Sequence, residues 1–268
     1  MISYLSLMRQ RRQEGLGPGS FDRLYREVLA PLFKSMADVR SSNTSYSMSD
    51  ARKCVFAIFS LKCASLFAFR QRSQAEDSNL GTVYEIERIP TDNTLRNILD
   101  QASPAKLREG LHLLFKQVSD MGLLDAYRYW GKHLVVSVDG VEHFCSKTVH
   151  CKHCLERSHR DGSTSYYHAM LSAAIVHPDK KEGLVRDNEP IGQQDGAVKN
   201  DCERNAAQRL FSHLKGLYAE EHMVFVCDAL YSCAPVVKAL CSVPSWAFII
   251  GVKPDSHKHL YRQFDEAD

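Results

Sequence analysis

The hydrophobic pattern of the first half of the chain is helical. In FDRLYREVLAPLF the apolar residues Leu24, Val28 and Leu32 recur at helical spacing, and similar stripes follow in SDARKCVFAIFSLKCASLFAF and SPAKLREGLHLLFKQVSDMGLL. Ser49 and Asp50 supply the cap of the second of these helices. In ERIPTDNTLRNILD, a proline is followed by Thr91 and Asp92, either of which can cap a further short helix. Residues 1–130 are therefore predicted to be helical.

After His133 the pattern becomes that of strands. The candidates are HLVVSVDG, SYYHAMLSAAIVHP, EHMVFVCDA and SWAFIIGVK, which are β-branched or apolar runs bounded by turn residues. Between the second and third, KNDCERNAAQRLFSHLKGLY predicts a helix that begins with Asn200 and Glu203 at capping-box spacing and carries Leu210, Leu214 and Leu217 on one face. A second helix, SCAPVVKALCS, follows Asp228. With one short strand after the first, this order predicts an α/β fold over residues 131–268, a mixed sheet flanked by helices.

Composition agrees with a globular chain. Of 268 residues, 44% are hydrophobic and 25% charged, with a net charge of +2. The N-terminus has no signal-peptide pattern, and the most apolar segment, residues 54–69, is interrupted by Lys62 and is too short for a bilayer. We read that segment as a buried helix and expect no membrane role. Nine cysteines without a secretion signal favour reduced thiols and a cytoplasmic location.

Two aspartates end apolar runs, Asp139 in VVSVDG and Asp228 in VFVCDA. If their strands are parallel neighbours, both carboxylates emerge at one edge of the sheet, where they repel unless a proton or a divalent cation lies between them. Carboxylates are hard ligands of the kind that hold Mg²⁺ together with substrate phosphates. The alternative is that each aspartate is an ordinary turn or cap residue. Asp201 and Glu203 are further acids in the neighbouring helix start, where we favour a structural role in the helix start over direct metal binding.

Much of the chain resembles DDE transposases of bacterial insertion sequences, whose catalytic domain has a ribonuclease-H-like fold. The resemblance runs through SLKCASLFAFRQR, NLGTVYEIERIPTDNTLRNILD, PIGQQDGAVKNDCERNAAQRL and FIIGVKPDSHKHL, and is most specific in the block from Ser137 to His177. In that family the first catalytic aspartate ends the first core strand and the second ends the fourth. The resemblance therefore implies that Asp139 and Asp228 are catalytic ligands of Mg²⁺ or Mn²⁺.

The third acid of that family, a glutamate on a later helix, has no counterpart here. Asp265, Glu266 and Asp268 follow the last predicted strand too closely to take this role. The resemblance therefore predicts an incomplete core over residues 131–268, missing its C-terminal part and inactive alone, so that enzymatic activity stays open. A non-catalytic DNA-binding remnant of a transposase is the alternative.

The resemblance also implies DNA as the partner: transposon terminal repeats and target DNA, bound by a homodimer on paired ends. The helical region, residues 1–130, would recognise the repeats, with Arg88 and Arg96 as phosphate contacts. A packing domain with ordinary surface arginines explains those residues as well.

A cluster of histidine and cysteine follows Asp139 in HFCSKTVHCKHCLERSH. Cys151 and Cys154 have C-x-x-C spacing, and two further ligands from His150, His159 or Cys145 would complete a tetrahedral zinc site. The alternative is a basic, polar hairpin beside the active site. The basic residues of this stretch, suited to DNA phosphates, are Lys147, Lys152, Arg157 and Arg160.

Overall fold

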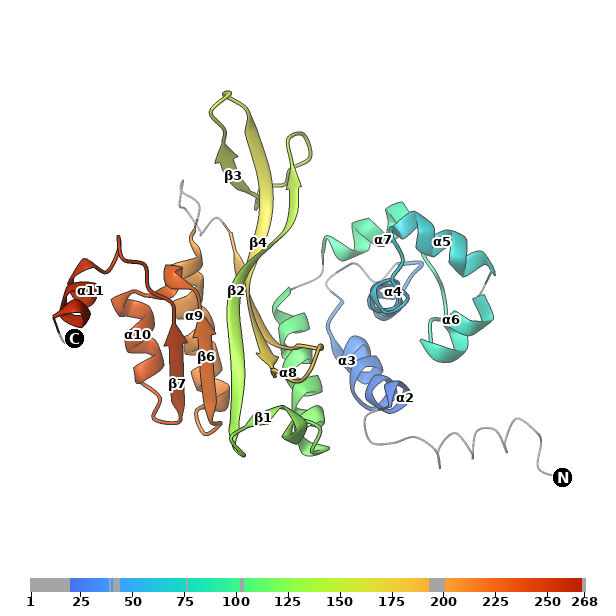
Figure 1. The fold of residues 1–268 in the computed structure, drawn as a ribbon. Helices are drawn as coiled ribbons and strands as arrows, with labels where there is room; N and C mark the ends of the chain where they lie inside the picture. Colours follow the sequence, from blue (N-terminus) through green and yellow to red (C-terminus); the bar gives the residue numbers. More distant parts are fainter. Residues whose placement is uncertain are drawn as a thin grey trace. The chain divides into compact units, whose positions relative to one another are not determined.

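The computed structural model describes residues 20–266, apart from residues 39, 41–43, 76, 102–103 and 193–200. The chain forms two compact units, Met1–Leu123 and Leu124–Asp268, and its elements are labelled in Figure 1. The second unit is a mixed α/β structure, as the strand and helix pattern predicts. In the described part of the chain, no helix is long and apolar enough to cross a membrane.

The described elements of the first unit are all helices. Its elements are α2 (Phe21–Leu24), the π-helical turn η1 (Tyr25–Leu29), α3 (Ala30–Ser35), α4 (Met48–Ser60), α5 (Leu66–Ala75), α6 (Asp77–Val83), α7 (Asp92–Leu99) and α8 (Pro104–Asp120).

The caps of the first unit differ in part from the sequence prediction. Thr91 caps α7 through the backbone N–H of Thr94, as expected. The cap of α4 is Ser47, whose hydroxyl accepts from the N–H of Asp50, so the prediction of Ser49 and Asp50 as the cap was wrong. The hydroxyl of Ser47, which directly precedes the first helical residue, reaches a free N–H group of the first turn.

The apolar segment 54–69 is two helices and not one. Helix α4 ends at Ser60 and α5 begins at Leu66, with Lys62 between them at a φ of 52°. The segment is also not uniformly buried, because Phe59 is 77% exposed. The break turns the chain so that α4 buries Cys54 and Ala57, while α5 contributes Phe69 to the same core.

The second unit contains the sheet. Its elements are η2 (Asp125–Tyr127), β1 (Arg128–Tyr129), β2 (His133–Ser146), β3 (Leu155–Ser158), β4 (Thr164–Val176), β5 (Leu184–Ile191), α9 (Glu203–Tyr218), β6 (Met223–Cys227), η3 (Ala229–Tyr231), α10 (Ala234–Cys241), β7 (Trp246–Ile250) and α11 (Lys258–Asp265).

The sheet is mixed, with strand order β3-β4-β2-β6-β7. Strands β2 and β4 are antiparallel, whereas β2, β6 and β7 are parallel neighbours. Strand β4 pairs with β3 through its first residues and with β5 through its later ones, so β3 and β5 follow one another along the same edge of β4. The paired ends of β2, β3 and β4 extend beyond the rest of the sheet as a hairpin arm (Figure 1).

Helices α9 and α10 pack against each other beside the sheet, α9 against β4 and β5 and α10 against β7. The ring of Phe225 in β6 contacts Phe211 of α9 at 5.2 Å and Trp246 of β7 at 4.8 Å between centroids. Leu210 and Leu214 of α9 are buried as predicted. Leu217, placed on the same face by the sequence, is half-exposed, and Phe211 takes its place in the core.

Two strands differ from the sequence prediction. Strand β2 continues through Asp139 and Gly140 to Ser146, because β4 pairs with it along this whole length. Strand β5 was not predicted, since LVRDNEPI has no apolar alternation. Its polar side chains are nevertheless buried: Asp187 contacts His213 of α9 at 2.9 Å, and Glu189 pairs with Arg209 at 2.6 Å.

Candidate functional site: an acidic edge and a Cys-Cys-His cluster

Asp139 and Asp228 lie side by side where the parallel pairing of β2 and β6 ends. Val138 pairs with Cys227 in the last register position of that pair, and each aspartate is the next residue. Adjacent strands are about 4.8 Å apart, so the two backbones are neighbours at one edge. The sequence pattern predicted Asp139 at the end of its strand. It lies inside β2 instead, but β6 stops beside it. The juxtaposition expected from two parallel strands is therefore present.

The backbone holds both carboxylates locally. The N–H of Gly140 donates to Oδ1 of Asp139 at 2.8 Å, and the N–H of Leu230 donates to Oδ1 of Asp228 at 2.8 Å. Asp228 is the N-cap of η3 through this contact. Both side chains stay exposed. Each carboxylate is thus oriented by one backbone donor and keeps its remaining lone pairs for another partner.

A third carboxylate, that of Glu203, lies beside them. Glu203 is the first residue of α9 and packs against the backbone of Gly140. Its Oε2 accepts a hydrogen bond of 2.9 Å from the hydroxyl of the fully buried Tyr231. The predicted capping box was wrong: Cys202 is the N-cap and makes no side-chain cap bond, and Asn200 lies outside the described residues. The carboxylate of Glu203 therefore lies against the strand position next to Asp139.

All three acids act on the pKa of the Tyr231 hydroxyl. Burial raises its pKa well above the ordinary value, and the charges of Glu203, Asp139 and Asp228 raise it further. A neutral hydroxyl held in this way remains a donor toward Glu203 at every physiological pH. We call Asp139, Asp228 and Glu203, with Tyr231 as their shared neighbour, the acidic edge.

The donor set of the acidic edge fits a divalent cation such as Mg²⁺. Its three side chains offer only carboxylate oxygens, the ligands that this ion takes along with water and phosphate. The three groups do not all come within 4.8 Å of one another, so the set is more open than the cysteine-histidine cluster described below. Glu203 is the first residue of α9, so the partial positive charge of the helix N-terminus lies near it.

The close packing of Glu203 on Gly140 gives a first prediction. A Cβ at position 140 would lie 2.6 Å from Cδ of Glu203, so Gly140→Ala should displace the carboxylate while the flexible side chain absorbs the clash. We expect Mn²⁺ affinity at the acidic edge, measured by calorimetry, to fall about tenfold, as when a partner that orients a ligand is lost. The thermal midpoint should change little.

The matched control is Gly216→Ala in α9, where an added Cβ meets nothing within 4 Å. This variant should bind Mn²⁺ like the unaltered chain. Equal affinities in the two variants would show that Glu203 has no part in cation binding.

No family model, curated protein or solved structure matches this chain. Its function is therefore inferred from the arrangement of its own side chains. Besides the acidic edge, that arrangement includes the cysteines and basic residues of the hairpin arm.

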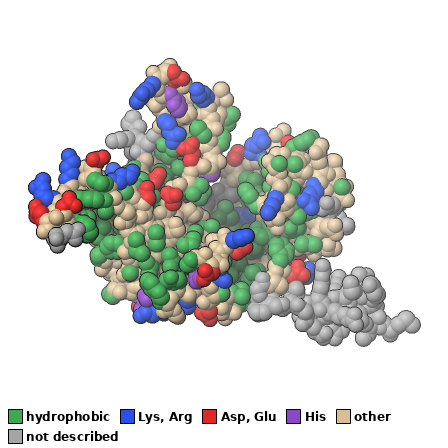
Figure 2. All heavy atoms as spheres, viewed as in Figure 1, with side chains coloured by type: hydrophobic (Ala, Val, Ile, Leu, Met, Phe, Trp, Pro, Cys, Tyr) green, Lys and Arg blue, Asp and Glu red, His purple; other side chains and the backbone are tan. Residues whose placement is uncertain are grey.

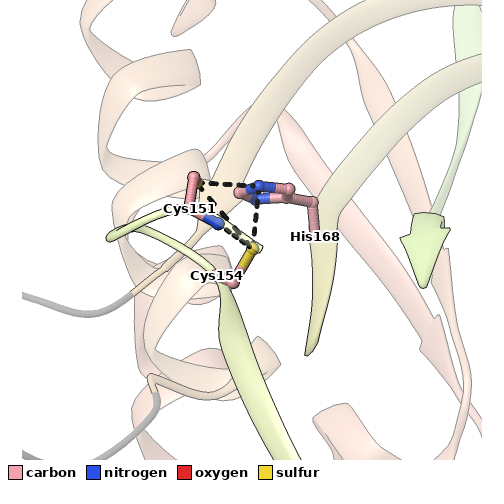
Figure 3. Close-up of side chains that lie close together, drawn as sticks. All are labelled: Cys151, Cys154 and His168. Carbon is pink, nitrogen blue, oxygen red and sulfur yellow. Dashed lines mark hydrogen bonds between the residues drawn. The ribbon is translucent and has the colours of Figure 1, made fainter. Parts of the chain in front are cut away.

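Cys151 and Cys154 converge on His168 of β4, and the three side chains point toward one another (Figure 3). Nε2 of His168 is 3.4 Å from each sulfur, and the sulfurs are 3.8 Å apart. The predicted ligands His150 and His159 are directed elsewhere: His150 stacks on Tyr166, and Nε2 of His159 is 2.8 Å from the hydroxyl of Ser165. The predicted ligands Cys151 and Cys154 are thus brought together, but the histidine beside them is His168 and not His150 or His159.

The four basic residues predicted to contact DNA are all exposed on the hairpin arm. Lys147 donates to the hydroxyl of Ser163, and Arg157 pairs with Glu142 at 2.6 Å while lying over the ring of Tyr167. Lys152 and Arg160 are exposed in the turns on either side of β3. Figure 2 shows Lys and Arg side chains on this arm, interspersed with acidic groups. The arm therefore offers cations to a polyanion without being uniformly basic.

Of the two predicted contacts in the first unit, Arg88 is engaged locally. Its Nη1 donates to the carbonyl of Ser45 at 2.7 Å, and its guanidinium lies 5.0 Å from the ring centroid of Tyr46. Arg96 is exposed on α7. Arg88 thus ties the lead-in of α7 to the loop before α4, and Arg96 is the freer of the two to meet a ligand.

Two residues of these sites were not assigned from the sequence. Glu203 was interpreted as a helix start, and His168 was not considered because it lies in an apolar run. The signal for Glu203 was its place in a helix start that follows the third strand. For His168 the chain offered no local signal, since strand register alone sets it opposite the cysteines.

Proposed function

We propose that this chain is a transposase-type protein that binds DNA ends and carries out metal-dependent DNA strand cleavage and transfer. The observation that carries the proposal is the pairing of Val138 with Cys227, which sets Asp139 and Asp228 side by side on parallel strands. The remaining support comes from strand order, the third acid and the basic hairpin arm.

The strand order supports a ribonuclease-H-like core. Leaving out the short strands β1 and β3, the five long strands lie in the order β5-β4-β2-β6-β7. In chain order this is third, second, first, fourth and fifth, with the first three antiparallel and the last two parallel to the first. This order and these directions are those we expect of a ribonuclease-H-like sheet, and they support that part of the proposal. Asp139 then belongs to the first core strand, and Asp228 directly follows the fourth, as the resemblance implies.

The acidic edge offers carboxylates of the kind that metal-dependent phosphodiester chemistry uses. Asp139 and Asp228 would hold Mg²⁺, which when bound activates a water or hydroxyl nucleophile and stabilises the leaving oxygen. Glu203 adds a third carboxylate from within this chain, and Tyr231 orients it by its hydrogen bond. Both aspartates remain exposed, so a DNA phosphate can approach them. With Glu203 as a third carboxylate, the reason to expect the chain to be inactive alone falls away.

DNA as the partner is supported by basic side chains on the hairpin arm, into which the strand of Asp139 continues. Strand β2 carries Asp139 and continues into the hairpin arm, which bears Lys147, Lys152, Arg157 and Arg160. Cations on an arm that leads away from the acidic edge suit the backbone of a duplex whose phosphate lies at the acids. The net charge of the chain is only +2, so this contribution is local.

The test is nicking of a supercoiled plasmid that carries the DNA flanking the gene for this chain. We expect relaxation of the plasmid with Mg²⁺ or Mn²⁺ and none with Ca²⁺ or a chelator, because Ca²⁺ takes a looser coordination shell. A mobility-shift assay on the same flanking fragments, in the presence of a chelator, measures binding separately.

Binding without nicking under any cation would favour the non-catalytic DNA-binding remnant. If the chain neither bound nor nicked the DNA, the proposal would be rejected. Binding and nicking together would support it, and the Asp variants discussed below would assign the activity to the acidic edge.

A further inference from the structure

The Cys151–Cys154–His168 cluster has the dimensions of a tetrahedral zinc site. With Zn–S about 2.3 Å and Zn–N about 2.05 Å, tetrahedral geometry sets sulfurs about 3.8 Å apart and sulfur and nitrogen about 3.6 Å apart. The observed separations are 3.8 Å between the sulfurs and 3.4 Å from each sulfur to Nε2 of His168. All three differ from the tetrahedral values by no more than about 0.2 Å.

Backbone donors already serve both sulfurs. The N–H of Cys151 is 3.3 Å from the sulfur of Cys154, and the N–H of His153 is 3.4 Å from the sulfur of Cys151. The turn is closed by the N–H of Cys154, which donates to the carbonyl of Cys151. These contacts hold the positions of both sulfurs, and a metal would bind them as thiolates. The C-x-x-C turn therefore presents two sulfurs to the same imidazole nitrogen.

The strands bring the histidine to this turn. Leu155, the first residue of β3, pairs with Tyr167 of β4, so Cys154 and His168 are the next residues on adjacent antiparallel strands. Cys154 is buried and His168 half-buried, while Cys151 is exposed. The third ligand is thus set by the register of the sheet, and the site remains accessible from the side of Cys151.

We propose that the hairpin arm binds one zinc ion through Cys151, Cys154 and His168. The soft thiolates together with an imidazole select zinc over the hard cations suited to the acidic edge. The fourth position is open to water or to His143, whose ring stacks on that of His168 with centroids 5.9 Å apart. His143 lies at the register shift of β2 between Glu142 and Phe144, which frees it from the regular pairing with β4.

The zinc fastens the loop between β2 and β3 to β4. In this loop Lys147 and Lys152 are two of the basic residues of the arm, and both are exposed. A metal that joins the loop to a strand reduces the number of loop conformations and fixes where these cations lie. The zinc site rests on distances within the arm alone and does not depend on the proposed DNA chemistry.

A disulfide is the competing use of two neighbouring cysteines. The sulfurs lie 3.8 Å apart, far beyond the bond length of about 2.05 Å. Both sulfurs also face the same imidazole nitrogen, which a disulfide would not require.

The experiment is metal analysis of the whole chain, expressed with zinc and purified under reducing conditions. We expect stoichiometric zinc, and after exchange to Co²⁺ the thiolate charge-transfer band and the strong visible absorption of a tetrahedral site. Cys151→Ser and His168→Gln should weaken zinc binding more than about 100-fold in competition with a chromogenic chelator, beyond the effect of losing an outer partner. Cys151 is exposed, so its variant is expected to fold; circular dichroism checks this.

The matched control is Cys145→Ser, an exposed cysteine of the same arm outside the cluster. It should retain full zinc, as should His150→Asn. A chain that purifies without zinc and does not take it up, or a Cys151→Ser variant that binds as tightly as Cys145→Ser, would overturn the proposal. So would a Cys151–Cys154 disulfide that persists under the reducing conditions of purification.

Discussion

Asp139→Asn and Asp228→Asn should each abolish divalent-cation-dependent DNA nicking, with a loss of at least ~10³-fold, while the chain stays folded. The size follows from removing a full negative charge from the point where a cation and the reacting phosphate meet, where single electrostatic contacts are worth 10²–10³-fold or more. The two carboxylates lie at adjacent positions of parallel strands, so neither can replace the other.

The fold should not suffer in these variants. Both aspartates are exposed, and each accepts one local backbone hydrogen bond that an asparagine oxygen can also accept. Removing one of several neighbouring negative charges lowers their mutual repulsion, so the thermal midpoint without divalent cations should stay the same or rise slightly. The measurements are plasmid nicking and Mn²⁺ calorimetry, together with thermal unfolding.

Asp179→Asn is the control for charge alone, because this aspartate lies in the turn after β4 with its side chain 88% exposed. Its nicking rate should equal that of the unaltered chain. Unfolding of the Asp139 or Asp228 variants would assign these aspartates a structural role, and undiminished nicking would remove them from the active site.

Phe225→Ala should destabilise the second unit by about 3–5 kcal/mol, the usual cost of removing a fully buried aromatic ring. Phe225 is 0% exposed in the middle of β6, and its ring joins Phe211 of α9 to Trp246 of β7. The cavity would lie between the sheet and its covering helix, where a strand with neighbours on both sides cannot shift to fill it.

Tryptophan fluorescence in a denaturant titration measures this loss selectively. Both tryptophans of the chain, Trp130 and Trp246, belong to the second unit. Phe264→Ala in α11 is the matched control, since its ring is 69% exposed and its loss should change the free energy of unfolding by no more than about 0.5 kcal/mol. Equal midpoints for the two variants would contradict the packing of β6 at the centre of this core.

The amino-acid sequence alone determined the elements whose stabilisation is local or strongly periodic. The helix that follows Pro104, the cap at Thr91 and helix α10 were readable because periodicity and capping operate within a few residues. The apolar runs before Asp139 and Asp228 likewise identified two strands, which are neighbours in the sheet. The C-x-x-C turn was visible for the same local reason.

Only the tertiary structure decided what depends on partners distant in the sequence. Strand β5 carries Arg186, Asp187 and Glu189 in buried positions. Each is stabilised by a side chain of α9: Tyr218 lies under the guanidinium of Arg186, His213 contacts Asp187, and Arg209 pairs with Glu189. No alternation within β5 itself records those contacts.

The difference between local and long-range contacts also explains which residues of the two candidate sites could be predicted from the sequence. Asp139 and Asp228 could be singled out from the sequence because each directly follows an apolar run of strand length. Glu203 joins them only because α9 begins against Gly140, and His168 meets the cysteines only because β3 pairs with β4 in one register. A shift of one residue in that register would turn His168 to the other face of the sheet.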